Sequence, residues 1–300
     1  MEIINKLLEN GDFDDILNKY ELYKYELLEE ISSILFPYPL HISSEEANLL
    51  KSIYINKAIM FKLDTEKVML ISDTHIGNDD FERLDYLNYI ASFCKQYQIH
   101  YLIHAGDIGD GTKNGKPLSF PDFKGNEALE QSQQIVEKYI VMPDVTQFVL
   151  GGNHDTRYIE HQNNVDILKL LADKKNIYPL GFIQAFFTIC GQVISLEHSS
   201  NRIYEESLIP HELAIKGHSH LWQPQNNILY IPTLSNYICH KGKEEGKAGF
   251  VIMQPIQTTD NTILQFDRYS FADSPGFLDA TKVDEKTYSL TRKKRTIENK

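Results

Sequence analysis

Five short polar motifs carry side chains of the types that bind metal ions. They contain carboxylates, imidazoles and one amide, at Asp73-Thr74-His75, Gly106-Asp107, Gly152-Asn153-His154-Asp155, Glu197-His198 and Gly217-His218-Ser219-His220. Such oxygen and nitrogen donors suit borderline-hard divalent cations such as Mn²⁺, Fe²⁺, Zn²⁺ or Ni²⁺. In extended chain, histidines two residues apart project to one side, so His218 and His220 can reach neighbouring ions. One motif alone is weak evidence, because it occurs often by chance, but the five together predict a metal site.

Each motif follows a short apolar segment that is typical of a buried strand. Residues 68–71, 101–103 and 147–150 precede the first three motifs, and residues 192–196 and 213–216 precede the last two. In α/β sheets, ligands bind at the loops beyond the carboxyl ends of strands. We therefore expect the five motifs to meet at one edge of the fold.

Helices and strands alternate through the first half of this region, whereas strands dominate the second half. Apolar residues at helical spacing predict helices at residues 81–94, 127–141 and 164–173. Residues 112–126 lack apolar periodicity, which indicates a long loop of a kind that is often functional. Further strands are predicted at residues 185–189, 228–231, 250–253 and 262–269. Many strands with few helices indicate a more antiparallel sheet in the second half.

In this order, the motifs resemble those of the calcineurin-like metallophosphoesterase superfamily, in its bacterial phosphodiesterase-type branch. The family pattern of D-x-H, G-D-x-x-D, G-N-H-D, H and G-H-x-H is met at residues 73–75, 106–110, 152–155, 198 and 217–220. The resemblance covers roughly residues 68–269. It implies an α/β fold, a four-layer α/β/β/α sandwich of two mixed β-sheets flanked by helices.

The resemblance implies a site for two divalent ions. Its ligands fall into two sets that share one carboxylate: Asp73, His75, His220 and Asp107 for one ion, and Asn153, His198, His218 and Asp107 for the other. Two such ions, about 3.5–4 Å apart, polarise a bridging water that attacks phosphorus in line. Asp107 suits the shared position because a carboxylate has two oxygens. Mn²⁺ is the expected metal, with Fe, Zn, Ni and Mg as alternatives.

The resemblance also implies roles for residues beside the ligands. His154 would lie near the leaving oxygen, where an imidazolium protonates the leaving alkoxide or stabilises charge on the phosphate. Asp155 would orient His154, so that His154, Asp155 and Asp107 form the catalytic set. Asp110 is the second Asp of G-D-x-x-D, and we interpret it as structural rather than as a ligand. His104, like the other histidines outside the motifs, is interpreted as a core residue.

Positions around the motifs separate the branches of this family. Ser199 and Ser200 follow His198 where Gly is common, which leaves the ligand assignment intact but the pocket wall undefined. The protein Ser/Thr phosphatase branch has Glu after G-N-H and Arg in its G-D-x-x-D-R-G segment, whereas this chain has Asp155 and Gly111. The resemblance therefore implies phosphodiesterase-type or exonuclease-type chemistry rather than a protein phosphatase.

Length and charge restrict the class of protein. The chain has 300 residues, which is enough for one large domain or for one domain with a small appendage, and its net charge is -12. Proteins that bind nucleic acid usually present a basic face, so this charge disfavours nucleic acid and favours a small phosphate-ester substrate. The 3 cysteines are scattered and indicate neither a disulfide framework nor a thiolate site. With no signal peptide pattern and no apolar run of ~18 residues, we expect a cytoplasmic protein without membrane contact.

The chain divides into three parts by pattern. Residues 1–62 carry a helical stripe and a capping box, and we predict a helical extension that serves as a cap or as a homo-oligomer surface. Residues 63–275 form the predicted metallophosphoesterase domain. Residues 276–300 form a predicted basic tail, whose Arg292-Lys293-Lys294-Arg295 run is typical of solvated chain.

These patterns predict a metal-dependent phosphoesterase, and most specifically a phosphodiesterase acting on a small nucleotide-like phosphodiester. Lys113, Lys116 and Lys124 in an otherwise acidic chain favour closure of residues 111–126 over the substrate as a lid. The alternative enzyme is a DNA exonuclease or endonuclease of the repair type, which would bind DNA in a salt-sensitive manner. The alternative outside the enzymes is a metal-bound scaffold for protein partners, which the complete ligand set disfavours.

Overall fold

The structure, a computed structural model, describes nine stretches of the chain. They are residues 67–118, 126–160, 165–182, 184–190, 192–198, 212–236, 246–258, 261–274 and 277–291. The predicted helical extension at residues 1–62 and the charge run at residues 292–295 lie outside the described residues. Ser199, Ser200 and Lys124 lie outside them as well.

The larger sheet has seven strands among the described residues. In spatial order they are β14 (Phe277–Thr291), β13 (Asn261–Ser274), β12 (Gly249–Gln257), β1 (Val68–Ile71), β2 (Tyr101–Ala105), β5 (Thr146–Gly151) and β6 (Ile177–Phe182). β1, β2, β5 and β6 run parallel, whereas β12, β13 and β14 pair antiparallel in succession. The carboxyl ends of β1, β2 and β5 therefore meet at one edge of the sheet.

The smaller sheet has five strands in the part of the chain that the structure describes. In spatial order they are β10 (Gln223–Pro224), β11 (Ile228–Tyr230), β9 (Leu213–Lys216), β8 (Gln192–Glu197) and β7 (Gln184–Ile189). β8, β9 and β11 run parallel, and the two rim strands are antiparallel to them. Two of the four described strand pairs of this sheet are antiparallel, so the second half is more antiparallel than the first, as the sequence predicts. The other antiparallel strands of that half, β12 to β14, extend the larger sheet.

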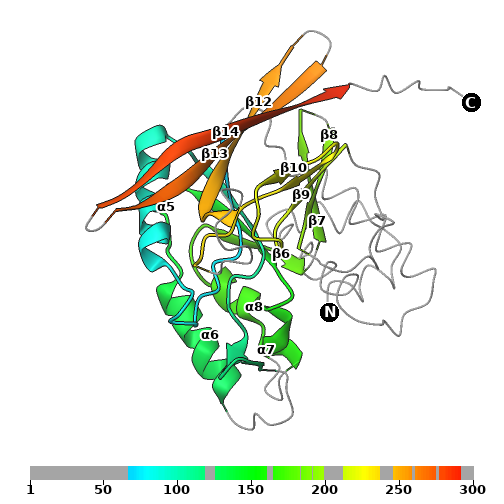
Figure 1. Cartoon of the computed structure of the whole chain (residues 1–300). Helices are drawn as coiled ribbons and strands as arrows, with labels where there is room; N and C mark the ends of the chain where they lie inside the picture. The colour runs from blue at the N-terminus through cyan, green and yellow to red at the C-terminus, as the bar shows by residue number, and fades with distance from the viewer. Residues whose placement is uncertain are drawn as a thin grey trace, which may run out of the picture.

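The sheets and helices form layers, and two hydrophobic cores lie between them (Figure 1). One core lies between the two sheets and includes Leu70 from the larger sheet and Ile215 from the smaller one. The other core packs helices against the outer face of the larger sheet, namely α5 (Leu84–Tyr97), α6 (Glu127–Lys138), α7 (Thr156–Glu160) and α8 (Ile167–Ala172). The described residues thus confirm an α/β fold with two mixed sheets, and supply one helical layer and both sheets of the predicted sandwich.

Strand β1 shows how the sequence builds both cores. Its 4 residues are fully buried and apolar. Because side chains alternate along a strand, Val68 and Leu70 enter the core between the sheets, whereas Met69 and Ile71 face the helices. A strand that is covered on both faces has to be apolar throughout. Burying each of these side chains contributes about 1.5–3 kcal/mol, which fixes the strand that carries the first motif.

Strand β14 corrects the predicted basic tail. The sequence predicts a tail from residue 276, whereas β14 pairs with β13 from Phe277 to Thr291. Most of its described side chains are exposed, and those of Tyr288 and Leu290 are buried. Backbone pairing with β13, rather than an apolar pattern, therefore forms this strand. The sheet continues past residue 275, where the sequence places the end of the domain.

A small hairpin replaces part of the predicted loop at residues 112–126. β3 (Thr112–Lys113) pairs antiparallel with β4 (Lys116–Pro117). Asn114 and Gly115 connect the two strands and have positive φ angles of 53° and 72°. Two-residue hairpin turns favour Asn-Gly because both residues must adopt this left-handed conformation. The lid role of the segment stays a prediction.

Candidate metal centre

All seven predicted ligands lie in loops at the carboxyl ends of five strands. The strands and the ligands that follow them are β1 with Asp73 and His75, β2 with Asp107, β5 with Asn153, β8 with His198, and β9 with His218 and His220. β1, β2 and β5 are neighbours in the larger sheet, and β8 and β9 are neighbours in the smaller one. Because the two sheets face each other across a shared core, these loops converge, as the sequence predicts.

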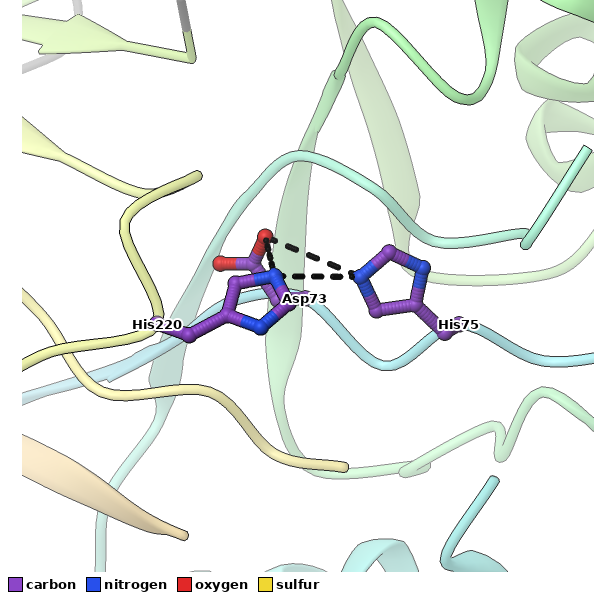
Figure 2. Close-up of side chains that lie close together, drawn as sticks. All are labelled: Asp73, His75 and His220. Carbon is purple, nitrogen blue, oxygen red and sulfur yellow. Dashed lines mark hydrogen bonds and ion pairs between the residues drawn. The ribbon is translucent and has the colours of Figure 1, made fainter. Parts of the chain in front are cut away.

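Asp73, His75 and His220 form the first group of ligand atoms. Asp73 Oδ1 lies 3.1 Å from His220 Nε2 and 3.9 Å from His75 Nε2, and the two Nε2 atoms are 3.3 Å apart. Figure 2 shows these atoms directed at one another from the β1 loop and the β9 loop. Two ligands that bind one ion through bonds of about 2.1 Å lie about 3.0–3.4 Å apart. The spacing of this group is therefore close to that of ligands around one ion.

Asp107, His198 and His218 form the second group. Asp107 Oδ2 lies 3.0 Å from His198 Nε2. Asn153 joins the group through its amide oxygen, which lies 2.8 Å from His218 Nδ1. The rings of His198 and His218 meet edge to face, with centroids 5.3 Å apart. The structure thus brings together the four residues that the resemblance assigns to the second ion.

Asp107 lies between the two groups. Its carboxylate is within reach of the second-group imidazoles on one side and of His75 and His154 on the other. A carboxylate has two oxygens and can neutralise two cations. Its place next to both groups is therefore the one expected of a ligand that two ions share.

Five of the seven predicted ligands have positive φ angles. They are Asp73 (56°), His75 (45°), Asp107 (54°), His218 (70°) and His220 (59°). The left-handed conformation costs a non-glycine residue about 1–2 kcal/mol. Such strain persists only where surrounding contacts fix it, and it is concentrated at functional sites. The strained backbone in these loops therefore points to a functional role for this cluster.

Two glycines allow the loops to approach one another closely. A Cβ atom on Gly152 would collide with Asp107 Oδ1, and one on Gly217 would collide with Ser72 Oγ. Any side chain at either position would therefore push the strand ends apart. The glycines of the G-N-H-D and G-H-x-H motifs serve close packing of the loops that carry the ligands.

Two buried carboxylates make the interior of the centre strongly negative. Asp73 and Asp107 are 0 % and 1 % exposed. Burial alone would raise their pKa values, but His220 and His198 beside Asp73, and His198 beside Asp107, hold both pKa values well below the ordinary range. Burial also opposes a charge on His198, yet Asp107 and Asp73 raise its pKa to about 9. Without other cations, a proton on His198 offsets the charge of the carboxylates.

The donor set fits divalent cations. Asp73 Oδ1 and His198 Nε2 are buried and make no hydrogen bond of good geometry to the described residues. A buried polar atom left in this state costs about 1–3 kcal/mol. A cation coordinated by these atoms would remove that cost and balance the two carboxylates. Imidazole, carboxylate and amide donors favour borderline or hard divalent ions over soft ones.

His154 lies at the rim of the centre, with its side chain 17 % exposed. Its Nε2 is 4.0 Å from Asp107 Oδ2. Its Nδ1 faces the backbone oxygen of Asp110 at 2.5 Å and Arg157 Nη1 at 2.9 Å. The carbonyl requires a proton on Nδ1, whereas the guanidinium requires a bare Nδ1 and thus a proton on Nε2. Each neutral tautomer of His154 therefore has a hydrogen-bond partner.

Burial changes the expected protonation state of His154. The sequence predicts an imidazolium at this position, but burial lowers the pKa of His154 to about 4, and the charge on Asp107 offsets this only in part. The imidazole is therefore neutral near pH 7. A neutral ring can donate a hydrogen bond through one nitrogen, and Arg157 favours the tautomer in which that nitrogen is Nε2.

Asp155 does not orient His154, which corrects the role predicted for it. Its two carboxylate oxygens accept hydrogen bonds from the backbone N–H groups of Gly152 at 2.7 Å, Gly109 at 2.8 Å and Ile108 at 3.1 Å. These bonds join the β5 loop to the β2 loop. Asp155 is therefore a structural residue that fixes the loop of Asp107 against the loop of His154.

Asp110 has the structural role that the sequence predicts. Its Oδ1 lies 3.3 Å from His75 Nδ1, and its Oδ2 accepts a hydrogen bond from Asn78 Nδ2 at 3.2 Å. The His75 ring is thereby held with its Nε2 toward Asp73. Carboxylates commonly orient metal-binding histidines through the ring nitrogen that does not bind the ion.

Sequence reasoning missed Arg157 beside His154. The signal was present, because Arg157 follows His154 by three positions, and the backbone N–H of Arg157 donates to His154 O at 3.3 Å in the turn that leads into α7. A contact between a cation and a predicted catalytic histidine could therefore have been expected. His104 lies in the core, as the sequence predicts.

Residues 66–245 match the sequence family of the calcineurin-like phosphoesterases. The match covers more than half of the chain and includes every predicted ligand. The chain therefore belongs to the calcineurin-like phosphoesterase family. Family membership and the Asp/His groups together support a metal-dependent phosphoesterase with a binuclear divalent metal site.

Several solved structures are similar to the chain at low sequence identity. A single mutant of Vps29 from Entamoeba histolytica is 14% identical, with 73% of this chain and 98% of that chain covered and a TM-score of 0.39. A predicted phosphoesterase from Streptococcus pneumoniae TIGR4 is 12% identical, with coverage of 74% and 99% and a TM-score of 0.34. GAP50, the anchor in the inner membrane complex of Plasmodium, is 14% identical, with coverage of 77% and 90% and a TM-score of 0.43.

The chain shows neither a match among curated proteins nor, in its described part, a helix suited to crossing a membrane. A search of curated proteins found none that matches the chain. Among the described residues, no helix has both the length and the apolar character needed to cross a membrane.

Proposed function

We propose that the chain is a phosphodiesterase that hydrolyses a small, nucleotide-like phosphodiester. The observation that carries this proposal is the position of Asp107 between two groups of buried ligand atoms. One carboxylate placed in this way suits a pair of divalent ions, and Mn²⁺ fits the carboxylate, imidazole and amide donors. Held there, the ions would supply positive charge to a water molecule and to the phosphoryl oxygens.

The proposed ligand roles follow the two groups of atoms. One ion takes Asp73, His75, His220 and Asp107, and the other takes Asn153, His198, His218 and Asp107. The orientation of the His198 ring supports its role, because its Nδ1 donates to the backbone oxygen of Ala105 at 2.5 Å and leaves Nε2 toward Asp107. A ring fixed through its far nitrogen presents the other nitrogen to an ion.

His154 is proposed to donate a hydrogen bond to the leaving oxygen. The Asp110 carbonyl favours a proton on Nδ1, whereas Arg157 favours a bare Nδ1. The proposed donor is the tautomer that Arg157 favours, with the proton on Nε2, the atom that is 4.0 Å from Asp107 Oδ2. A donor beside the shared carboxylate would meet negative charge as it develops on the leaving group. A hydrogen bond to a charged group contributes about 1.5–3 kcal/mol. The ring acts as a neutral donor, because burial lowers the pKa of His154 to about 4.

The charge of the chain supports a small diester as the substrate. At a net charge of -12, a long polyanion such as duplex DNA would be repelled, since its binding depends on neutralising many phosphates. A phosphodiester carries one negative charge and a phosphomonoester carries nearly two at neutral pH. The diester therefore costs less to bring to an acidic protein.

A substrate panel tests the proposal. The chain is loaded with Mn²⁺ and assayed with bis(p-nitrophenyl) phosphate, p-nitrophenyl phosphate, cyclic nucleotides and duplex DNA. The Asp107→Asn variant removes the shared carboxylate, and Asp144→Asn makes the same change at an exposed position. We expect the small diesters to react fastest, Asp107→Asn to lose more than about 100-fold in kcat/KM, and Asp144→Asn to match the wild type.

Each contrary result has a definite meaning. Faster hydrolysis of the monoester would contradict the phosphodiesterase assignment. Activity on DNA alone would favour the repair-type nuclease instead. A chain that binds Mn²⁺ and hydrolyses none of these esters would favour a scaffold, and activity retained in Asp107→Asn would overturn the site.

A further inference from the structure

His104 is a buried imidazole that no predicted ligand set includes. It lies in β2, three residues before Asp107, and its exposed fraction is 0 %. Its Nδ1 accepts a hydrogen bond from the backbone N–H of Gly106 at 3.2 Å, and its Nε2 lies 3.1 Å from Thr74 Oγ1. Its ring lies beside that of Tyr139, with centroids 6.1 Å apart. Both ring nitrogens therefore bond to loops that carry proposed ligands.

The groups at the two ends of this hydrogen-bonded set, a backbone N–H and a backbone carbonyl, determine which group donates in every bond. A backbone N–H only donates, so Nδ1 of His104 accepts from Gly106 and carries no proton. The proton of the neutral ring then lies on Nε2 and is donated to Thr74 Oγ1. The Thr74 hydroxyl donates in turn to the backbone oxygen of Ile108 at 2.9 Å. These bonds form one continuous bridge, which runs from Gly106 through His104 to Thr74 in the β1 loop and returns to Ile108 in the β2 loop.

The bridge encloses the proposed ligands of both loops. Thr74 lies between Asp73 and His75, and the other end of the bridge flanks Asp107 on both sides. All three of these ligands have positive φ angles, and strained backbone persists only where surrounding contacts fix it. Thr74 bonds inward to His104, while Asp73 Oδ1 and His75 Nε2 meet in the centre at 3.9 Å.

Backbone bonds also join the two loops, but they do not set the orientation of the Thr74 side chain. Asp73 N donates to Gly106 O at 2.9 Å, and His75 N donates to Asp107 O at 3.2 Å. These bonds set the distance between the loops. The bridge through His104 adds the restraint that keeps Thr74 turned away from the ligand atoms of its two neighbours.

We propose that His104 and Thr74 are positioning residues whose buried bridge holds the β1 and β2 loops in the geometry that binds the two ions. The proposal rests on the proposed metal centre. It assigns a role to a histidine that neither binds an ion nor touches the substrate. Hydrogen-bonded partners that orient metal ligands typically affect metal affinity by about 10–100-fold.

Matched variants separate this role from general packing. Thr74→Val keeps the shape of the side chain but removes the hydroxyl, and Thr74→Ser keeps the hydroxyl. Ser132→Ala is the control, because Ser132 is fully buried in α6 and its hydroxyl donates one bond to Leu129 O at 2.7 Å, away from the ligand loops. His104→Gln is a second variant of the bridge, since its amide can replace only one of the two ring nitrogens.

Metal binding is measured with Mn²⁺ alone, by calorimetric titration and by electron paramagnetic resonance of the loaded chains. We expect Thr74→Val to bind Mn²⁺ about 10–100-fold more weakly, and His104→Gln to be weakened in the same direction. Thr74→Ser and Ser132→Ala should bind as the wild type does. The resonance of a coupled Mn²⁺ pair should give way to that of isolated ions in Thr74→Val.

The outcomes distinguish this proposal from the proposed function. Wild-type affinity and coupling in Thr74→Val and His104→Gln would overturn the positioning role and leave the metal centre intact. An equal loss in Ser132→Ala would also overturn it, because any lost buried hydrogen bond would then have the same effect. Failure of the wild-type chain to bind Mn²⁺ would overturn the metal centre itself.

Discussion

The two sheets contribute different chemistry to the centre. The loops after β1, β2 and β5, here the carboxylate loops, bring the two predicted carboxylate ligands, Asp73 and Asp107. The loops after β8 and β9, here the imidazole loops, bring His198, His218 and His220. The carboxylate loops thus supply the negative charge of the centre, and the imidazole loops supply neutral donors and, at His198, a group that takes up a proton.

The two sets of loops are also held in different ways. The carboxylate loops are joined by backbone pairing beyond β1 and β2 and by three backbone N–H groups that donate to Asp155. The imidazole loops bond to them, from His198 Nδ1 to Ala105 O and from His218 N to Asp73 Oδ2 at 3.1 Å. We conclude that the carboxylate loops form a base: they are fixed to one another, and the imidazole loops are held in position by hydrogen bonds to them. A substitution that breaks contacts within the base should therefore destabilise the chain more than a substitution in the imidazole loops.

The largest expected effect couples the two sets of loops through the proton on His198. Asp107 and Asp73 raise the pKa of His198 to about 9, so the ring holds a proton at pH 7 and must lose it to bind an ion. Affinity for Mn²⁺ should therefore rise about 10-fold per pH unit, or about 100-fold from pH 7 to pH 9, and level off above that. Calorimetric titration across this range measures it. A constant affinity would show that the carboxylates do not hold a proton on His198.

The next effect tests the base directly. Asp155→Asn keeps the shape but replaces one acceptor oxygen by an amide NH₂ that faces backbone N–H donors. Each buried group left without a partner costs about 1–3 kcal/mol, so the free energy of unfolding should fall by about 2–4 kcal/mol. Urea denaturation of the metal-free chain measures this loss.

The same substitution at Asp166 provides the control. Asp166 accepts hydrogen bonds from the backbone N–H groups of Leu168 and Lys169 at the start of α8. Asn serves this capping position about as well as Asp, so Asp166→Asn should change stability little. Equal losses in the two variants would mean that Asp155 has no special part in holding the carboxylate loops.

A smaller effect concerns the rim of the centre. His154→Ala should retain Mn²⁺ and lose about 10–100-fold in kcat/KM on alkyl phosphodiesters, with a much smaller loss on nitrophenyl esters, whose leaving groups need little help. Arg157→Met should reproduce part of this loss, since Arg157 Nη1 is 2.9 Å from His154 Nδ1. Equal losses on both ester classes in His154→Ala would remove the hydrogen-bond role at the leaving oxygen.

The smallest effect is expected in the imidazole loops. Lys216 Nζ and Glu197 Oε2 form an ion pair of 2.6 Å directly before the loops of His218 and His198, with side chains 22 % and 12 % exposed. Partly exposed pairs contribute about 1 kcal/mol or less, so Lys216→Met should lower the free energy of unfolding by no more than that. This loss of stability should be smaller than the loss expected for Asp155→Asn. A greater loss than in Asp155→Asn would reverse the proposed order of the two sets of loops.

The sequence predicts the strands that are continuously apolar, and misses strands that lack such a run. β1 is apolar throughout, and β2 is apolar except for His104, because each strand contacts two cores. β14 is mostly exposed, and β6 contacts both cores, through Leu180 and Phe182, but contains Pro179 and Gly181, which usually mark turns. Pairing with a neighbouring strand decides both cases, and that neighbour is distant in the sequence for β6.

The sequence also predicts the residues of the site better than their contacts. All seven predicted ligands converge, because each follows a strand end and the strand order brings those ends together. The resemblance implies that Asp155 orients His154, yet the oxygens of Asp155 accept hydrogen bonds from backbone N–H groups of two loops. Arg157 and His104 act through contacts that depend on the helix start and on the packing of two loops.

The most direct test of this account is the number of ions that one chain binds. Metal analysis after Mn²⁺ loading and removal of excess metal should give about two ions per wild-type chain, because two groups of ligand atoms share Asp107. The Asp107→Asn variant should bind fewer than about one, whereas Asp144→Asn should match the wild type. One ion per wild-type chain, or two ions in Asp107→Asn, would contradict a binuclear centre built around Asp107.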